Sequence, residues 1–314
     1  MEIYIDQRIE LITIIQTLCN YWDNLAQKYF NKTLFQCKYK ENITQYFEKY
    51  KQNEILGLYK NLCNDESDIS AFLTLILNYS QPPELNKIFN NNENKYEHFI
   101  ENVRKFYAEA NINYFFENNK NEYEKILSDF GNKENILKDI GSIFNYFDIN
   151  NKNYKIIISP LILGNFGISI GMDNYILISP LEYKENKYIF GSNESIRNII
   201  WHEISHTVIN DLTKKYFNYS KYENMEKSNI KVSNIYNNME TIISEYIIRS
   251  ITYLLEKDND CSKALLDYEI KSGFNKIEEI KEYIIKNCTE NNKFVKDKRY
   301  IGLIDYVINN LKTI

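Results

Sequence analysis

The stretch WHEISHTVIND, residues 201 to 211, contains His202, Glu203 and His206 in the pattern H-E-x-x-H. On an α-helix, positions i and i+4 lie on one face about one turn apart, so both imidazoles can reach one metal ion. The chain has three histidines, and chance would produce this pattern in roughly a few of every thousand sequences of such composition. The alternative is a solvated helix face with two incidental histidines. The pattern favours a metal site.

The residues around the motif predict the helix that carries it. An apolar stripe that begins at Ile196 and Ile200 repeats with helical spacing over residues 193–212. Ser192 or Asn193 can cap the start of this helix, because a short polar side chain there accepts a hydrogen bond from a free backbone N–H. We therefore expect the three motif residues on one well-defined helix.

A catalytic zinc ion takes three protein ligands and keeps one position open. No histidine follows His206, and the longer metzincin pattern fails because Ile209 and Leu212 stand where it needs glycine and histidine. The third ligand should therefore be a carboxylate from a later helix, which we predict over residues 234–256.

Glu240 and Glu245 are the two candidates on that helix. They are five residues apart, or about 140° around a helix, so both cannot easily face one ion. Glu245 has Arg249 at i+4, where a guanidinium can steady a carboxylate ligand. Glu240 has Ile243 and Ile247 on its side. We favour Glu245 and keep Glu240 as the alternative.

This residue set predicts metal-assisted hydrolysis. Zinc lowers the pKa of a bound water toward ~7, and Glu203 is the expected general base, which moves a proton from that water to a leaving amine. Imidazole and carboxylate also suit other first-row ions. Asn210, one turn past His206, is a candidate to support that histidine, whereas we assign His98 no role.

A tyrosine is the expected donor to the oxyanion of the tetrahedral intermediate, because no spare histidine lies near the motif. The sequence does not rank the eligible tyrosines: Tyr216, Tyr219, Tyr222, Tyr236 and Tyr246.

The rest of the chain predicts a mainly helical α+β fold. Residues 1–150 read as almost entirely helical, with long helices over 8–30 and 95–117. Residues 154–190 read as short strands, including YKIIISPLIL, NYILISPLEY and an edge strand at GISIG that can align an extended peptide. We expect a helical N-terminal region packed on a zincin-like catalytic region at 151–314, whose small mixed sheet lies next to the H-E-x-x-H helix.

Composition limits the other possibilities. The net charge of −5 gives no electrostatic case for nucleic acid or an anionic membrane surface. The N-terminus lacks the layout of a signal peptide, and no apolar run is long enough to span a bilayer, so we expect a cytoplasmic protein. The five cysteines form no C-x-x-C pair, which argues against a cysteine zinc site or a disulfide framework.

The whole chain resembles an uncharacterised bacterial family of gluzincin-like zinc metallopeptidases, known as a domain of unknown function. The resemblance rests on IDQRIEL (5–11), on the Pro-terminated strands, on WHEISHTVIN and on SEYIIRSITYL. The family commonly has Asn-Pro after the metal helix, whereas Asp211 follows Asn210 here. The resemblance implies a gluzincin fold. It also implies that His202, His206 and Glu245 are the metal ligands, with Glu203 as the general base and Arg249 as a support for Glu245.

These observations predict a zinc-dependent hydrolase of the gluzincin type with one zinc per chain, acting on a peptide or protein. Two alternatives stay open. The first is a binding or scaffold protein with a structural or vestigial zinc, in which a side chain closes the fourth position. The second keeps the metal but takes a non-peptide amide in a small closed pocket.

Overall fold

The computed structural model has a mainly helical α+β fold with small sheets, as the sequence predicts. It divides into two compact units, Met1–Lys133 with Asn153–Gly191, and Glu134–Lys152 with Ser192–Ile314. The strands that we expected in one region with the H-E-x-x-H helix thus group with the N-terminal helices. The structure describes residues 1–31, 34–64, 69–89, 96–131, 133–222, 232, 236 and 238–311.

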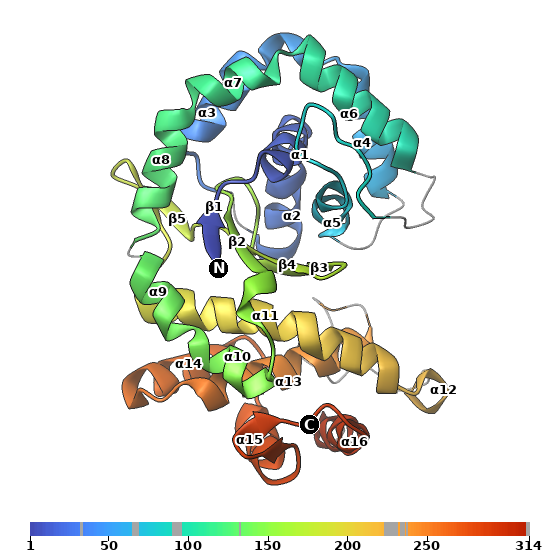
Figure 1. The fold of residues 1–314 in the computed structure, drawn as a ribbon, viewed down its shortest axis with the longest axis vertical. Helices are drawn as coiled ribbons and strands as arrows, with labels where there is room; N and C mark the ends of the chain where they lie inside the picture. Colours follow the sequence, from blue (N-terminus) through green and yellow to red (C-terminus); the bar gives the residue numbers. More distant parts are fainter. Residues whose placement is uncertain are drawn as a thin grey trace. The chain divides into compact units, whose positions relative to one another are not determined.

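In the first unit, the helices α6, α7 and α8 follow one another as an arc (Figure 1). The helices of this unit are α1 (Gln7–Leu18), α2 (Tyr21–Phe30), α3 (Lys38–Tyr46), α4 (Glu54–Asn64), α5 (Ala71–Leu77), α6 (Glu97–Glu109), α7 (Ile112–Asn118) and α8 (Lys120–Asp129).

Two helices that we predicted as continuous are broken at asparagines. The expected helix over 8–30 is α1 and α2, separated at Asn20, whose φ is 55°. The expected helix over 95–117 is α6 and α7, separated at Asn111, whose φ is 49°. A left-handed residue cannot continue a right-handed helix, and asparagine adopts that conformation at lower cost than most residues. The prediction of single helices was therefore wrong at both places.

The main sheet is mixed and has the strand order β1-β2-β4-β3. Its strands are β1 (Glu2–Tyr4), β2 (Tyr154–Ile158), β3 (Phe166–Ile170) and β4 (Asp173–Ile178). β3 lies at an edge and pairs antiparallel with β4, which confirms the edge strand predicted at GISIG. β1, which the sequence reading missed, forms the other edge and runs parallel to β2.

The repeated Ile-Ser-Pro-Leu segments mark two equivalent strand ends. β2 and β4 are parallel neighbours, and Ile158 is paired with Ile178. Gly171 makes the turn from β3 to β4 at a φ of 60°, where a Cβ would approach the Phe89 ring to 2.5 Å. A small separate hairpin follows, made of β5 (Glu182–Lys184) and β6 (Lys187–Ile189).

The IDQRIEL segment is a structural junction of the first unit. Asp6 caps α1 by accepting a hydrogen bond from the backbone N–H of Arg8, and it pairs with the Arg8 guanidinium at 2.7 Å. Arg8 also donates to the carbonyl of Tyr79 at 2.9 Å. Glu10 accepts a hydrogen bond of 2.9 Å from Ser159 at the end of β2. The segment therefore ties α1 to the sheet.

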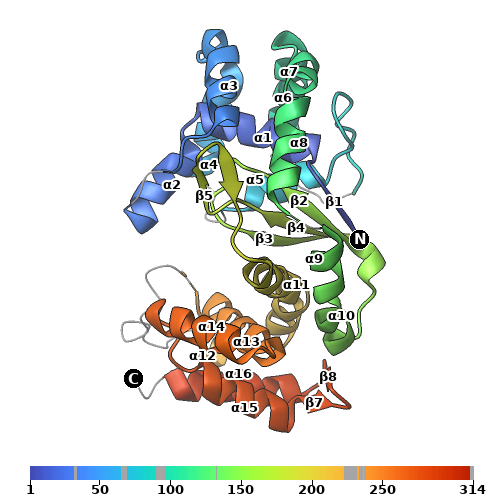
Figure 2. The same ribbon diagram turned by 90° about the vertical axis from the view of Figure 1, so that its left-hand side faces the viewer.

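The second unit is a layered helical assembly in which α15 and α16 pack against α13 and against each other (Figures 1 and 2). Its helices are α9 (Lys133–Asp139), α10 (Gly141–Phe147), α11 (Asn193–Tyr216), α12 (Tyr219–Tyr222), α13 (Met239–Leu255), α14 (Asn259–Lys271), α15 (Ile277–Asn287) and α16 (Arg299–Leu311). A two-stranded hairpin, β7 (Thr289–Glu290) and β8 (Lys293–Phe294), separates the last two helices.

α11 and α13 are antiparallel neighbours that are tied near both ends. Arg197 of α11 forms an ion pair with Glu256 at the end of α13. Toward the other end, Ser244 donates a hydrogen bond of 2.9 Å to Thr213. α13 corresponds to the helix predicted over 234–256, and part of the predicted start lies outside the described residues. In the described part of the chain, no helix is long and apolar enough to cross a membrane.

Candidate metal centre

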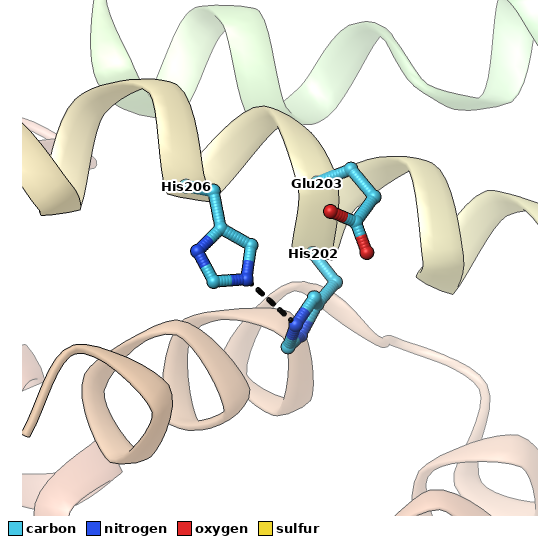
Figure 3. Close-up of side chains that lie close together, drawn as sticks. All are labelled: His202, Glu203 and His206. Atoms are coloured by element: carbon cyan, nitrogen blue, oxygen red, sulfur yellow. Dashed lines mark hydrogen bonds between the residues drawn. The ribbon is translucent and has the colours of Figure 1, made fainter. Parts of the chain in front are cut away.

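The H-E-x-x-H motif lies in the middle of α11, a helix with a defined start. Ser192 has an extended backbone and accepts a hydrogen bond of 3.2 Å from the N–H of Ser195, which makes Ser192 the N-cap. Continuous helical geometry from Asn193 to Tyr216 then places His202 and His206 on one face (Figure 3). Both imidazoles project from α11 in the same direction, as the i, i+4 spacing predicts.

The two imidazoles meet at their Nε2 atoms, which are 3.1 Å apart. α13 brings a carboxylate to the same point. Glu245 Oε1 lies 3.5 Å from His206 Nε2, and Glu245 Oε2 lies 3.7 Å from His202 Nε2. The Glu245 side chain is 7% exposed and each imidazole 17%, so the three groups converge in a largely buried place.

These distances suit a tetrahedral metal ion. Two ligand atoms bound at about 2.05 Å with a tetrahedral angle between them are about 3.3 Å apart. The 3.1 Å between the two Nε2 atoms and the 3.5 Å from His206 Nε2 to Glu245 Oε1 lie close to that value, and the 3.7 Å from His202 Nε2 ends on the other carboxylate oxygen, Oε2. The donor set of two imidazoles and one carboxylate is also the set that catalytic zinc takes in several enzymes.

A second carboxylate, that of Glu203, belongs to the same group. His202, Glu203 and His206 each offer a ligand atom, and these atoms all lie within 4.8 Å of one another, so this group can hold a metal ion. Glu203 is 6% exposed. Two carboxylates therefore compete for the role of third ligand. We favour Glu245, because its oxygens lie within 3.7 Å of both Nε2 atoms and Arg249 holds it in place.

Arg249 links the carboxylate of Glu245 to a part of the molecule that the sequence did not point to. Its Nε donates to Glu245 at 3.1 Å, and its Nη1 donates to Glu269 of α14 at 2.5 Å. Its Nη2 lies 3.4 Å from the hydroxyl of Tyr236. The guanidinium carbon lies 4.1 Å from the centre of the Phe274 ring, within the range of a cation–π contact.

The charges of this cluster call for a cation. In formal charge, Glu245 and Glu269 carry −2 and share Arg249, which carries +1. Buried charge is costly unless it is offset, and a cation beside Glu245 would offset what Arg249 leaves. Burial, followed by the nearby charges of His206 and Arg249, lowers the pKa of His202 well below its usual value. The neutral imidazole is the form that binds a metal.

The remaining candidates lie in different surroundings. Asn210 is placed to support His206, since its Oδ1 lies 3.3 Å from His206 Nδ1. Glu240, the alternative ligand, lies in the first turn of α13, where it accepts a hydrogen bond from Tyr219 of α12. His98 lies on α6 of the first unit, 4.0 Å from Glu101.

Of the five tyrosines, Tyr236 is the one with a hydrogen bond to the Arg249 network. Tyr219 donates a hydrogen bond to Glu240, Tyr222 donates to Asp305, and Tyr246 donates to the carbonyl of Gly273. The ring of Tyr216 packs on that of Tyr300.

The residues that the sequence reading missed are Glu269 and Phe274. Glu269 is the one buried residue of α14, and this helix has no apolar stripe that faces a core. Hydrophobic periodicity therefore gave no signal for it. The sequence does indicate where α14 begins, because Asp258 caps this helix by accepting a hydrogen bond of 2.9 Å from the N–H of Cys261.

Fold and centre together define a mainly helical α+β protein with a group of side chains that can hold a metal ion. The chain belongs to the family described as domain of unknown function DUF4932, whose model matches residues 81–304. The match includes every residue of the centre and leaves out the IDQRIEL segment. Comparisons with curated proteins and with solved structures gave no match. The family description names no activity, so the gluzincin assignment stays a prediction.

Proposed function

We propose that the protein is a zinc-dependent hydrolase of the gluzincin type that cleaves amide bonds in a peptide or protein substrate. The observation that carries this proposal is the convergence of His202, His206 and Glu245 at separations of 3.1 to 3.7 Å. These three residues would hold one zinc ion per chain. When bound, zinc supplies Lewis-acid catalysis, because it polarises a carbonyl group and lowers the pKa of water toward ~7.

The chain supplies the proton transfers. Glu203 follows His202 directly, and its carboxylate stays within 4.8 Å of the ligand nitrogens. It accepts a proton from the attacking water and delivers that proton to the leaving amine. The low exposure of Glu203, at 6%, keeps bulk water away from its carboxylate. Tyr236, held beside Arg249, donates its hydroxyl proton in a hydrogen bond to the oxyanion of the intermediate.

The first test is the zinc content of the purified chain, measured by elemental mass spectrometry. We expect near-stoichiometric zinc in the parent and in Glu240→Ala, and loss of zinc in Glu245→Ala. Glu240→Ala is a matched control, because it removes a carboxylate from the same helix. A parent that stays free of metal after zinc is added and the excess removed would refute the metal site.

The second test separates binding from catalysis. We expect Glu203→Gln to keep its zinc and to lose cleavage of a fluorogenic peptide library by at least 10²-fold, because the general base is gone. Chelation should abolish the parent's activity, and zinc should restore it. Full activity in Glu203→Gln would overturn the mechanism. Stoichiometric zinc in a parent that cleaves neither peptides nor small amides would favour the scaffold alternative.

A further inference from the structure

Arg249 is held on several sides by groups from different parts of the second unit. Glu245, one turn earlier on α13, accepts a hydrogen bond from its Nε, and Glu269 of α14 accepts one from its Nη1. The Phe274 ring lies against the guanidinium carbon, and the Tyr236 hydroxyl lies beside Nη2. The side chain of Arg249 is 15% exposed, so its orientation is set by these partners and not by water.

The two oxygens of Glu245 have different surroundings. Oε2 accepts the Arg249 hydrogen bond at 3.1 Å and lies 3.7 Å from His202 Nε2, whereas Oε1 has no bond to Arg249 and lies 3.5 Å from His206 Nε2. An arginine beside a carboxylate ordinarily forms two parallel hydrogen bonds, one to each oxygen. Arg249 gives Glu245 a single bond, from Nε, because its Nη2, which would supply the second parallel bond, faces the Tyr236 hydroxyl at 3.4 Å. Its Nη1 donates to Glu269 at 2.5 Å, so Glu269 and Tyr236 together fix the guanidinium in this orientation.

We propose that Glu269 is a positioning residue for the metal centre: it holds Arg249 in the orientation that supports one oxygen of Glu245 and leaves the other for the metal. The inference rests on the proposed zinc site and adds a residue from a third helix to it. Without the Glu269 carboxylate, Nη1 loses its partner, and the guanidinium is free to turn until Nε and Nη2 both face Glu245 in a bidentate pair. The metal then competes with a guanidinium for its third ligand.

The test measures zinc affinity by competition with a chromophoric chelator at one pH. Groups that hold metal ligands typically change metal affinity by 10- to 100-fold when they are removed. We expect Glu269→Gln to weaken zinc binding by about that factor. Glu269→Asp, which keeps the charge, should recover a large part of the affinity. Circular dichroism of the metal-free variants checks that each is folded.

A double-mutant cycle shows whether Glu269 acts through Arg249. In an Arg249→Met background, the guanidinium is gone, so adding Glu269→Gln should weaken zinc binding no further. Additive losses in the two variants would overturn the proposal, and so would parent-like affinity in Glu269→Gln. Zinc-free parent protein would instead refute the site on which the inference rests.

Glu256→Gln is the matched control for loss of a buried ion pair. Glu256 is 6% exposed and Glu269 is 5% exposed, and each pairs with an arginine of the second unit. Glu256 pairs with Arg197 and has no hydrogen bond to Arg249 among the described residues. We expect its zinc affinity to stay within about twofold of the parent. An equal loss in both variants would mean that Glu269 acts only through general stability, and would also overturn the proposal.

Discussion

Tyr236 combines burial with a hydroxyl group beside a fixed cation. Burial is the main cause that raises the pKa of the Tyr236 hydroxyl, and the charge of Glu245 raises this pKa further. The charge of Arg249 acts in the opposite direction. The phenol is therefore protonated at neutral pH, as a hydrogen-bond donor to an oxyanion must be. The other four candidate tyrosines were equivalent in sequence, and only the path of the chain in space separates them.

Tyr236→Phe tests this role. We expect kcat of peptide cleavage to fall by about 10²- to 10³-fold with zinc content unchanged, because one donor to the developing oxyanion is removed. Tyr246→Phe is the control, since its hydroxyl donates to the carbonyl of Gly273 instead. Equal kcat values in Tyr236→Phe and the parent would contradict the assignment.

Glu10 gives the first unit a pH-dependent stability. Burial raises the pKa of this carboxyl to about 7, although Ser159 donates a hydrogen bond to it. A raised native pKa means that the folded state holds the proton more tightly than the unfolded state. The stabilisation is thus complete below the ordinary pKa of glutamate and is lost as the pH rises toward and through 7.

We expect the free energy of unfolding of the first unit to fall by roughly 3 kcal/mol between pH 4.5 and pH 8 through this group. Glu10→Gln, which cannot ionise, should flatten that part of the profile. Urea unfolding followed by Trp22 fluorescence in a Trp201→Phe background measures it, since these are the chain's two tryptophans. An unchanged slope in Glu10→Gln would contradict the prediction.

At the scale of elements, the sequence predicted the two helices of the candidate metal centre better than it predicted helix boundaries. α11 follows from its cap at Ser192 and its apolar stripe, and Glu245 could be preferred because Arg249 is one turn away. The breaks at Asn20 and Asn111 could not be foreseen, because an asparagine in a left-handed conformation has the same letter as one inside a helix. β1 is only three residues long, too short for a periodic signal.

The break between α6 and α7 can be tested at Asn111. A β-branched residue is strained in a left-handed backbone, so Asn111→Val should lower the free energy of unfolding by about 1–2 kcal/mol. Asn111→Gly should be close to neutral, because glycine adopts this conformation readily. Asn118→Val, at an exposed helical position of α7, serves as the control and should cost only a few tenths of a kcal/mol. Equal losses at the two positions would show that the left-handed backbone is not the cause.

At the scale of the whole molecule, the division into units was not readable from the sequence. The strands at 154–178 lie closer in sequence to the H-E-x-x-H helix than to α1, and they nevertheless group with α1. Parallel pairing of β1 with β2 connects residues about 150 positions apart. Such long-range pairing has no local signature, whereas the residues of the candidate metal centre were recognisable from spacings within α11 and within α13; the packing of these two helices on each other was not.

This division predicts that zinc stabilises one unit selectively. A ligand that binds only the folded state stabilises it by about 2.7 kcal/mol at 100 times its dissociation constant. We expect zinc to raise the urea midpoint reported by Trp201, in a Trp22→Phe variant, and to leave the midpoint reported by Trp22, in the Trp201→Phe variant, nearly unchanged. Glu245→Ala should abolish the shift. An unmoved Trp201 transition in metal-loaded protein would contradict this expectation.

The two ties between α11 and α13 also bear on how this family can evolve. The Arg197–Glu256 pair and the Thr213–Ser244 bond hold the helices together on either side of the histidines, and neither uses His202, His206 or Glu245. A descendant that replaced His202 and His206 would lose the candidate metal site but keep the helix pair. Selection can therefore act on the site and on the scaffold separately, so a relative can lose the site and keep the same helix pair.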